Sequence, residues 1–133
     1  MGPRARLAAL SRLEVVVMNE VWRLGECGSA QVVEAVQARR KLAPTTIRTV
    51  LANLREKGYV LPVPSLDRGF RWKPKVSREA VARRGVKELL ATLFDGSPRQ
   101  AIAYLLDEEP LSDADRTAIR TLLAQRNKDG GGA

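Results

Sequence analysis

The chain has 133 residues and a formal net charge of +8, with 23 Lys and Arg against 15 Asp and Glu, and its sequence pI is about 10.4. No apolar run approaches the ~18 residues that span a bilayer, so we expect no membrane insertion and a cytoplasmic protein. Histidine is absent and Cys27 is the only cysteine. This composition excludes an internal disulfide and disfavours an enzyme, a metal site or a cofactor.

Basic residues gather in the first part of the chain. Residues 1–75 hold 14 Lys and Arg against 6 Asp and Glu, whereas residues 76–133 hold 9 of each. This division predicts that the first part binds a polyanion and that the second binds protein. A generally basic proteome is the alternative explanation.

Two helices are predicted before residue 40. The first begins at Ser11, which with Glu14 forms a capping-box pattern, and ends at Gly25. Its apolar stripe consists of Leu13, Val17, Val21 and Leu24, widened by Met18 and Trp22. The second runs from Gly28-Ser29 to about Arg39, with Val32, Val33 and Val36 facing inward. We expect Trp22 in the core and Cys27 in a small pocket near the turn between the two helices.

The segment 44–58 predicts a third helix and is the most informative part of the chain. Proline at its first position and glycine just past its end mark its bounds. One face is apolar, with Ile47, Val50, Leu51 and Leu54 at helical spacing. The opposite face carries short, hydrogen-bonding or cationic side chains and no acid: Thr45, Arg48, Thr49 and Ala52. Such a face suits the DNA major groove, and three helices with tight connections predict a helix-turn-helix.

A β-hairpin is predicted directly after this helix. Residues 59–63 and 70–73 are short aromatic and branched runs, and residues 64–69 between them are rich in turn formers. A hairpin in this place is the wing of a winged helix. We expect Pro62 to keep its strand at a sheet edge, because proline cannot donate to a ladder, and Trp72 to pack on the hinge to the rear half.

The rear half predicts three more helices, ending near Phe94, ending before Glu108, and beginning at Ser112. Three short helices bury little apolar surface alone, so we expect them to close against a second copy of the chain. The predicted dimerisation residues are Leu89, Leu93, Phe94, Ile102, Leu105, Leu106, Ile119, Leu122 and Leu123.

The fold class is therefore mainly α with a small β-hairpin: a winged helix-turn-helix followed by a C-terminal helical dimerisation segment. We expect a flexible arm over residues 1–9, a DNA-binding domain over 10–75, a dimerisation domain over 76–126 and a disordered tail over 127–133.

The segment 42–60, Leu-Ala-Pro-Thr-Thr-Ile-Arg-Thr-Val-Leu-Ala-Asn-Leu-Arg-Glu-Lys-Gly-Tyr-Val, resembles the signature of the penicillinase repressor family. That family holds the β-lactam-responsive and copper-responsive winged-helix repressors of bacteria. Leu13-Glu14, Val17-Met18 and Val21-Trp22 resemble its first helix, and Leu111-Ser112 before an acidic helix resembles its last. The resemblance covers about residues 10–125.

The resemblance implies a homodimeric repressor at an inverted-repeat operator in double-stranded DNA. It also implies that the family's recognition-helix contacts to DNA correspond to Thr45, Thr46, Arg48 and Thr49. The basic residues of the family's wing correspond to Arg68 and Arg71. The residues themselves add phosphate contacts at the basic turn 39–41, chiefly Arg40 and Lys41, and at Arg55. Thr45 or Thr46 could instead cap the helix, and Arg55 could simply be solvated.

Two departures from the family concern induction. Copper-responsive members end in a paired-cysteine motif, whereas this chain has no cysteine after Cys27. β-Lactam-responsive members are cut by a membrane-bound sensor protease, at an Asn-Phe bond in the best-known cases. The equivalent stretch near Tyr104-Leu105 lacks that pair, so relief of repression by such a protease stays open.

A basic RNA- or ribosome-associated protein is the main alternative function. Readers of single-stranded RNA usually offer aromatic stacking platforms, and only 5% of this chain is aromatic. A small nuclease is a weaker alternative, because the sequence shows neither a metal cluster nor a glycine-rich phosphate loop.

Overall fold

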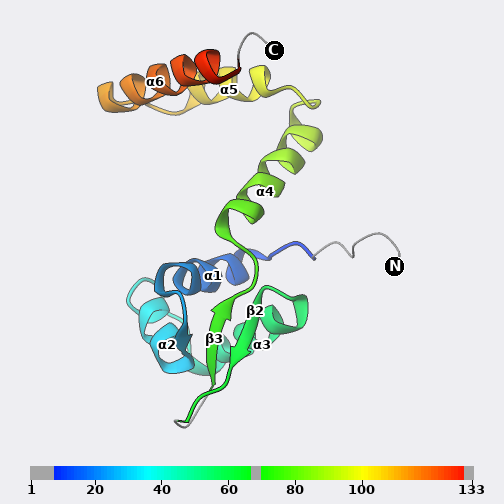
Figure 1. Cartoon of the computed structure of the whole chain (residues 1–133), viewed down its shortest axis with the longest axis vertical. Coiled ribbons are helices and arrows are strands. Elements are labelled where there is room, and N and C mark those ends of the chain that lie inside the picture. The colour runs from blue at the N-terminus through cyan, green and yellow to red at the C-terminus, as the bar shows by residue number, and fades with distance from the viewer. Residues whose placement is uncertain (1–7, 67–69, 131–133) are drawn as a thin grey trace. The chain divides into compact units, whose positions relative to one another are not determined.

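The computed structural model describes residues 8–66 and 70–130 (Figure 1). The chain divides into two compact units, Met1–Arg84 and Gly85–Ala133. The elements of the first unit are α1 (Arg12–Leu24), β1 (Cys27–Gly28), α2 (Ser29–Gln37), α3 (Pro44–Lys57), β2 (Val60–Val63) and β3 (Arg71–Pro74). Helix α4 (Arg78–Leu93) begins in the first unit and continues in the second, which also holds α5 (Pro98–Glu108) and α6 (Asp113–Gly130).

Local signals set the bounds of α1 and α3 as the sequence predicts. Ser11 caps α1 and forms the capping box with Glu14, and Gly25 ends the helix. Helix α2 ends at Gln37, slightly before the expected Arg39. Gly58 closes α3 in the left-handed conformation with φ of 85°, a backbone shape that favours glycine.

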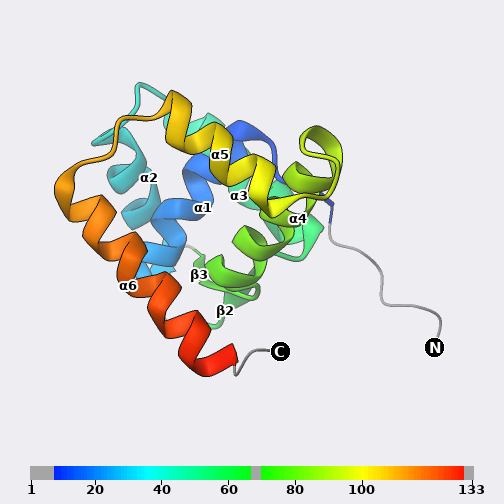
Figure 2. The same ribbon diagram turned by 90° about the horizontal axis from the view of Figure 1, so that it is seen from above.

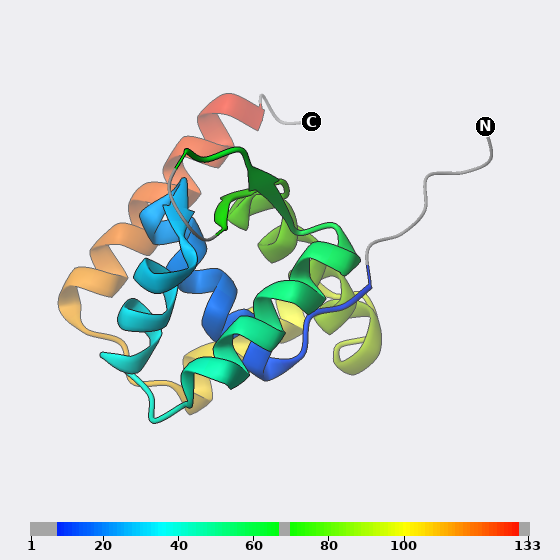
Figure 3. The same ribbon diagram turned by 90° about the horizontal axis from the view of Figure 1, so that it is seen from below.

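The core of the first unit lies where α1, α2 and α3 pack on one another and on the sheet. Views from opposite sides show α1 between α2 and α3 (Figures 2 and 3). The buried apolar residues are Val17, Met18, Val21, Cys27, Val32, Val33, Val36, Ile47, Val50, Leu51, Leu54, Tyr59, Val60 and Trp72. Leu24, predicted on the inward stripe, is exposed at the end of α1.

The sheet has three antiparallel strands in the order β1-β3-β2. Strand β1 was not predicted from the sequence, because two residues are too few to show a period. Cys27 pairs with Trp72 and Gly28 with Arg71, so β1 covers one edge of the hairpin. Strand β2 is the other edge, which confirms the expected place of Pro62.

The two tryptophans each join separate segments of the first unit through a hydrogen bond. Trp72 is buried in the core, and its indole N–H donates to Ser29 Oγ at 2.8 Å, which ties β3 to the start of α2. Trp22 is half-buried and packs against the core, as expected of its inward position, and its indole N–H donates to the carbonyl of Val76, just before α4. The guanidinium of Arg78 lies 5.5 Å from the Trp22 ring centre, so Trp22 supports the start of α4.

The second unit has no buried residue between positions 85 and 128. Phe94 and Tyr104 make an edge-to-face contact with ring centres 5.8 Å apart, which links the end of α4 to α5. Helix α6 continues to Gly130, past Arg126, where the sequence predicts that the helix gives way to a tail. No residue between 127 and 129 breaks a helix, so the helical period runs on to the first glycine.

Candidate nucleic-acid interface

Helix α3 presents a polar face to solvent because its apolar face is used by the core. Ile47, Val50, Leu51 and Leu54 are buried, as predicted. The outer side chains Thr45, Arg48, Thr49, Ala52 and Arg55 are exposed, and Thr46 is half-buried. The N-cap residue is Ala43, and no side chain bonds to the first turn, so the threonines do not cap this helix. In the part of the chain that the structure describes, no hydrogen bond of these threonine hydroxyls is found, so they can face a ligand.

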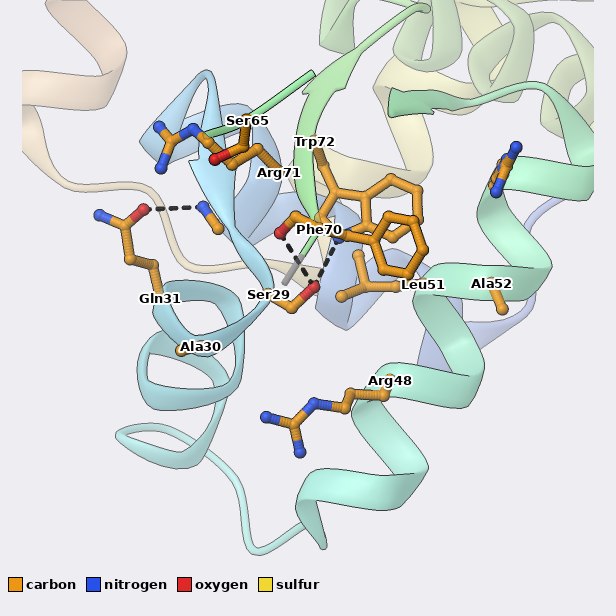
Figure 4. Close-up of a pocket in the computed structure, with 12 residues that line it drawn as sticks. Ser29, Ala30, Gln31, Arg48, Leu51, Ala52, Ser65, Phe70, Arg71 and Trp72 are labelled. Atoms are coloured by element: carbon orange, nitrogen blue, oxygen red, sulfur yellow. Dashed lines mark hydrogen bonds between the residues drawn. The ribbon is translucent and has the colours of Figure 1, made fainter. Parts of the chain in front are cut away.

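A groove of about 760 Å³ lies beside this face, between α2, α3 and the wing (Figure 4). We use "wing" for β2, β3 and the described part of their connection. The residues that line the groove are Gly28, Ser29, Ala30, Gln31, Arg48, Leu51, Ala52, Arg55, Ser65, Phe70, Arg71 and Trp72. Among these lining residues there is no acid and there are three arginines, so the groove suits an anionic ligand.

The arginines of the groove differ in their availability. Arg71 is half-buried, and its Nε lies 3.6 Å from a carboxylate oxygen of Glu26. Within the described residues, neither Arg48 nor Arg55 forms an ion pair. Figure 4 shows the Arg48 guanidinium extended below Ser29, toward α2. Arg48 and Arg55 are therefore the two groove arginines that no carboxylate of the described residues holds.

The basic turn 39–41 is divided between two tasks. Arg39 Nε lies 3.4 Å from Oε2 of Glu20, whose side chain is 5% exposed, so Arg39 ties the end of α2 to α1. Arg40 and Lys41 are exposed and, in the part of the chain that the structure describes, have no ion pair. The Gln37 amide donates to the carbonyl of Leu42 at 3.1 Å and fixes the turn that carries them.

A second buried glutamate holds the far end of α3. Lys57 Nζ lies 2.6 Å from Glu14 Oε1 and also donates to the carbonyl of Ala9 at 3.1 Å. Burial opposes ionisation of Glu14, but hydrogen bonds from Lys57 and from the backbone and hydroxyl of Ser11 outweigh it and lower its pKa. Lys57 is therefore a structural cation. Neither buried glutamate was foreseen, since a single acid on an amphipathic helix looks solvated.

The remaining predicted residues have these places. Arg68 lies outside the described residues. The predicted dimerisation residues are on α4, α5 and α6, and all except the half-buried Phe94 are exposed.

The described residues contain no group of three potential metal ligands, and no described helix is long and apolar enough to cross a membrane. Sequence reasoning missed Phe70, which lines the groove and is 61% exposed.

A helix-turn-helix followed by a hairpin, with a polar third helix beside the hairpin, defines the winged-helix class of protein. The solution structure of the DNA-binding domain of the repressor BlaI has this fold. It matches 56% of this chain and 90% of that chain with a TM-score of 0.51 and 23% sequence identity.

Sequence comparison gives a narrower assignment. Residues 10–125 match the family model described as penicillinase repressor. The transcriptional regulator BlaI of Mycobacterium tuberculosis is 36% identical over 123 residues, covering 91% of this chain and 87% of that protein. The methicillin resistance regulatory protein MecI of Mammaliicoccus sciuri is 22% identical over 117 residues, covering 88% of this chain and 94% of that protein. The chain therefore belongs to the penicillinase repressor family.

Proposed function

We propose that this chain is a transcriptional repressor that binds double-stranded operator DNA as a homodimer. The observation that carries the proposal is the outer face of α3, which carries no acid from Thr45 to Arg55. Arg48 and Arg55 on it form no ion pair within the described residues and lie beside a groove whose lining has arginines and no acid. Membership of the family supports it, since one relative is named a transcriptional regulator and a similar fold is the DNA-binding domain of a repressor. We assign the chain no catalytic role and place it with the DNA in the cytoplasm.

Within this proposal the residues divide into readers and anchors. Arg48 reads base edges in the major groove with the help of Thr45, Thr46 and Thr49, because arginine and hydroxyl side chains match the donors and acceptors there. The anchors neutralise phosphates, which sets register and makes affinity depend on salt. They are Arg40, Lys41, Arg55, Arg68 and Arg71.

The homodimer follows from the exposed apolar residues of the second unit. Leu93, Leu122 and Leu123 are each exposed by more than half, which is costly unless a partner covers them. We assign DNA binding to residues 10–75 and dimerisation to residues 76–126. A two-fold dimer presents two copies of α3, so the operator consists of two inverted half-sites about one helical turn, or a multiple of it, apart.

Relief of repression is assigned to cleavage in the rear half by a membrane-bound sensor protease. The stretch that corresponds to the family's cleavage site lies in α5, where Tyr104 and Leu105 are exposed. A protease needs an extended substrate, so this helix has to unwind locally before it is cut.

The test uses duplexes selected by the full-length protein from a random pool. Arg48→Ala is expected to bind the selected and the random duplex with nearly equal affinity, since a well-placed arginine contributes about 1–3 kcal/mol of base discrimination. Fluorescence anisotropy with labelled duplexes measures both affinities. Arg99→Ala, an exposed arginine on α5, is the matched control and keeps the preference of the wild type. If Arg48→Ala keeps that preference too, Arg48 does not read bases.

Single-stranded RNA of the same length, added as competitor in the same titration, addresses the alternative function. Displacement of the selected duplex by an equal concentration of RNA would contradict the proposal.

A further inference from the structure

Phe70 is a large apolar residue that is exposed to solvent. Phe70 is 61% exposed, although it lies directly before β3, in which Trp72 is buried. The two ring centres are 5.7 Å apart with planes inclined by 32°, and Figure 4 shows the Phe70 ring over the indole. One side of the ring is thus supported by the core, and the other faces the groove.

The backbone beneath this ring is fixed from two directions. The Ser29 N–H donates to the Phe70 carbonyl at 3.0 Å, and the Ser29 hydroxyl donates to the same carbonyl at 3.3 Å. Ser29 Oγ in turn accepts the indole N–H of Trp72. The position of Phe70 is therefore set by the first residue of α2 and by the core, so little ordering is needed when a ligand meets the ring.

The surroundings of the ring match the two components of a DNA backbone. Arg48 and Arg55 of α3 line the same groove, and Arg55 supplies charge for a phosphate. The groove is otherwise formed by small or apolar side chains, among them Leu51 and Ala52. Deoxyribose is the apolar component of the backbone, and an aromatic ring gains by burying apolar surface against it.

We propose that Phe70 is a further DNA-contact residue, whose ring packs against deoxyribose of the strand that passes between α3 and the wing. This inference rests on the proposed function, because it concerns the same DNA. Phe70 contributes to affinity without reading sequence and without neutralising charge. Arg55, which lines the same groove, neutralises a phosphate of that strand, and Arg48 reads base edges.

The experiment compares Phe70→Ala with the wild-type full-length protein on a duplex that the wild type has selected from a random pool. Phe70→Ala is expected to weaken binding about 10-fold at every salt concentration, with an unchanged slope of log affinity against log salt. Arg55→Gln, in contrast, is expected to reduce that slope by about 0.9, as for one lost phosphate contact. Phe70→Leu, which keeps apolar bulk, is expected to stay within about 3-fold of the wild type.

A matched control and a direct readout separate contact from folding. Leu66→Ala removes another exposed apolar side chain from the same connection and is expected to bind as the wild type does. Hydroxyl-radical cleavage reports on sugars, so the wild type is expected to protect deoxyriboses that Phe70→Ala leaves open while other protections persist. A general loss of structure would instead weaken all protections together.

Three results would overturn the inference while leaving the proposed function intact: wild-type affinity of Phe70→Ala, an unchanged sugar footprint, or a larger loss on single-stranded than on duplex DNA. The last result would make Phe70 a stacking platform for bases. Failure of the wild type to select any duplex would instead overturn the proposed function.

Discussion

Replacing Glu14 with alanine is expected to lower the free energy of unfolding of the first unit by about 2.5 kcal/mol. Glu14 lies in the first turn of α1 and is 5% exposed. Its carboxylate accepts the Ser11 backbone N–H at 2.8 Å and Lys57 Nζ at 2.6 Å. The substitution removes the acceptor from both donors. It leaves the ammonium group of Lys57, whose side chain is 30% exposed, beside α1 without this carboxylate.

Each of the two contacts has an expected magnitude. The reciprocal half of a capping box contributes about 1 kcal/mol. A hydrogen bond between charged partners contributes about 1.5–3 kcal/mol, and the lower end applies because water still reaches part of Lys57. The two together give the figure of about 2.5 kcal/mol.

The same pair makes stability depend on pH in a defined direction. The pKa of Glu14 is lowered in the folded protein from its usual 4.5, so the folded state prefers the ionised carboxylate. The resulting stabilisation is present above pH 4.5 and is lost as the pH falls through the folded pKa. Glu14→Gln keeps an acceptor but not the charge, so the gap between wild type and this variant is expected to close in acid.

Urea unfolding followed by tryptophan fluorescence measures these free energies, because Trp22 and Trp72 both belong to the first unit. Glu79→Gln changes an exposed acid in the first turn of α4 and is the matched control. A loss under about 0.5 kcal/mol for Glu14→Ala would refute the reasoning, since that is the range of neutral surface substitutions. A gap between wild type and Glu14→Gln that stays constant with pH would refute the charge argument alone.

Two further predictions concern the basic turn and the dimer. Arg39→Ala is expected to leave the slope of log DNA affinity against log salt unchanged, because Arg39 is paired with Glu20. Arg40→Ala is expected to reduce the magnitude of that slope by about 0.9. Equal slopes for the two variants in DNA titrations would contradict this division. Leu93→Asp is expected to shift the protein from dimer to monomer in sedimentation equilibrium, because Leu93 is 69% exposed on α4. Ala91→Asp, about 200° away around the helix, is expected to remain dimeric, and a dimeric Leu93→Asp would refute the assigned surface.

The sequence predicted the winged helix because each of its elements has a local signal. The capping box at Ser11, the glycine at position 58 and the apolar spacing of α3 all act within a few residues of one another. Periodicity also indicated which face of α3 turns outward, since the buried and exposed sets lie on opposite sides of one helix. The position of Pro62 at an edge followed from its missing N–H.

The sequence did not indicate which charged and aromatic side chains meet across the fold. Arg39 and Arg40 are neighbours with the same chemistry, yet only Arg39 reaches Glu20. The partners of Trp72 and Lys57 are each 43 residues away in the chain. Such pairings depend on how helices and strands pack, and no local pattern encodes them.

The sequence by itself therefore determined that this chain forms a winged helix with a polar third helix and a neutral, helical rear half. Only the tertiary structure decided that Glu14 and Glu20 are buried anchors, that Arg48 and Arg55 share a groove whose lining has no acid, and that the exposed Phe70 lines the same groove. The reason is physical: period and caps act over one or two turns of chain, whereas burial and ion pairing are settled when distant segments pack.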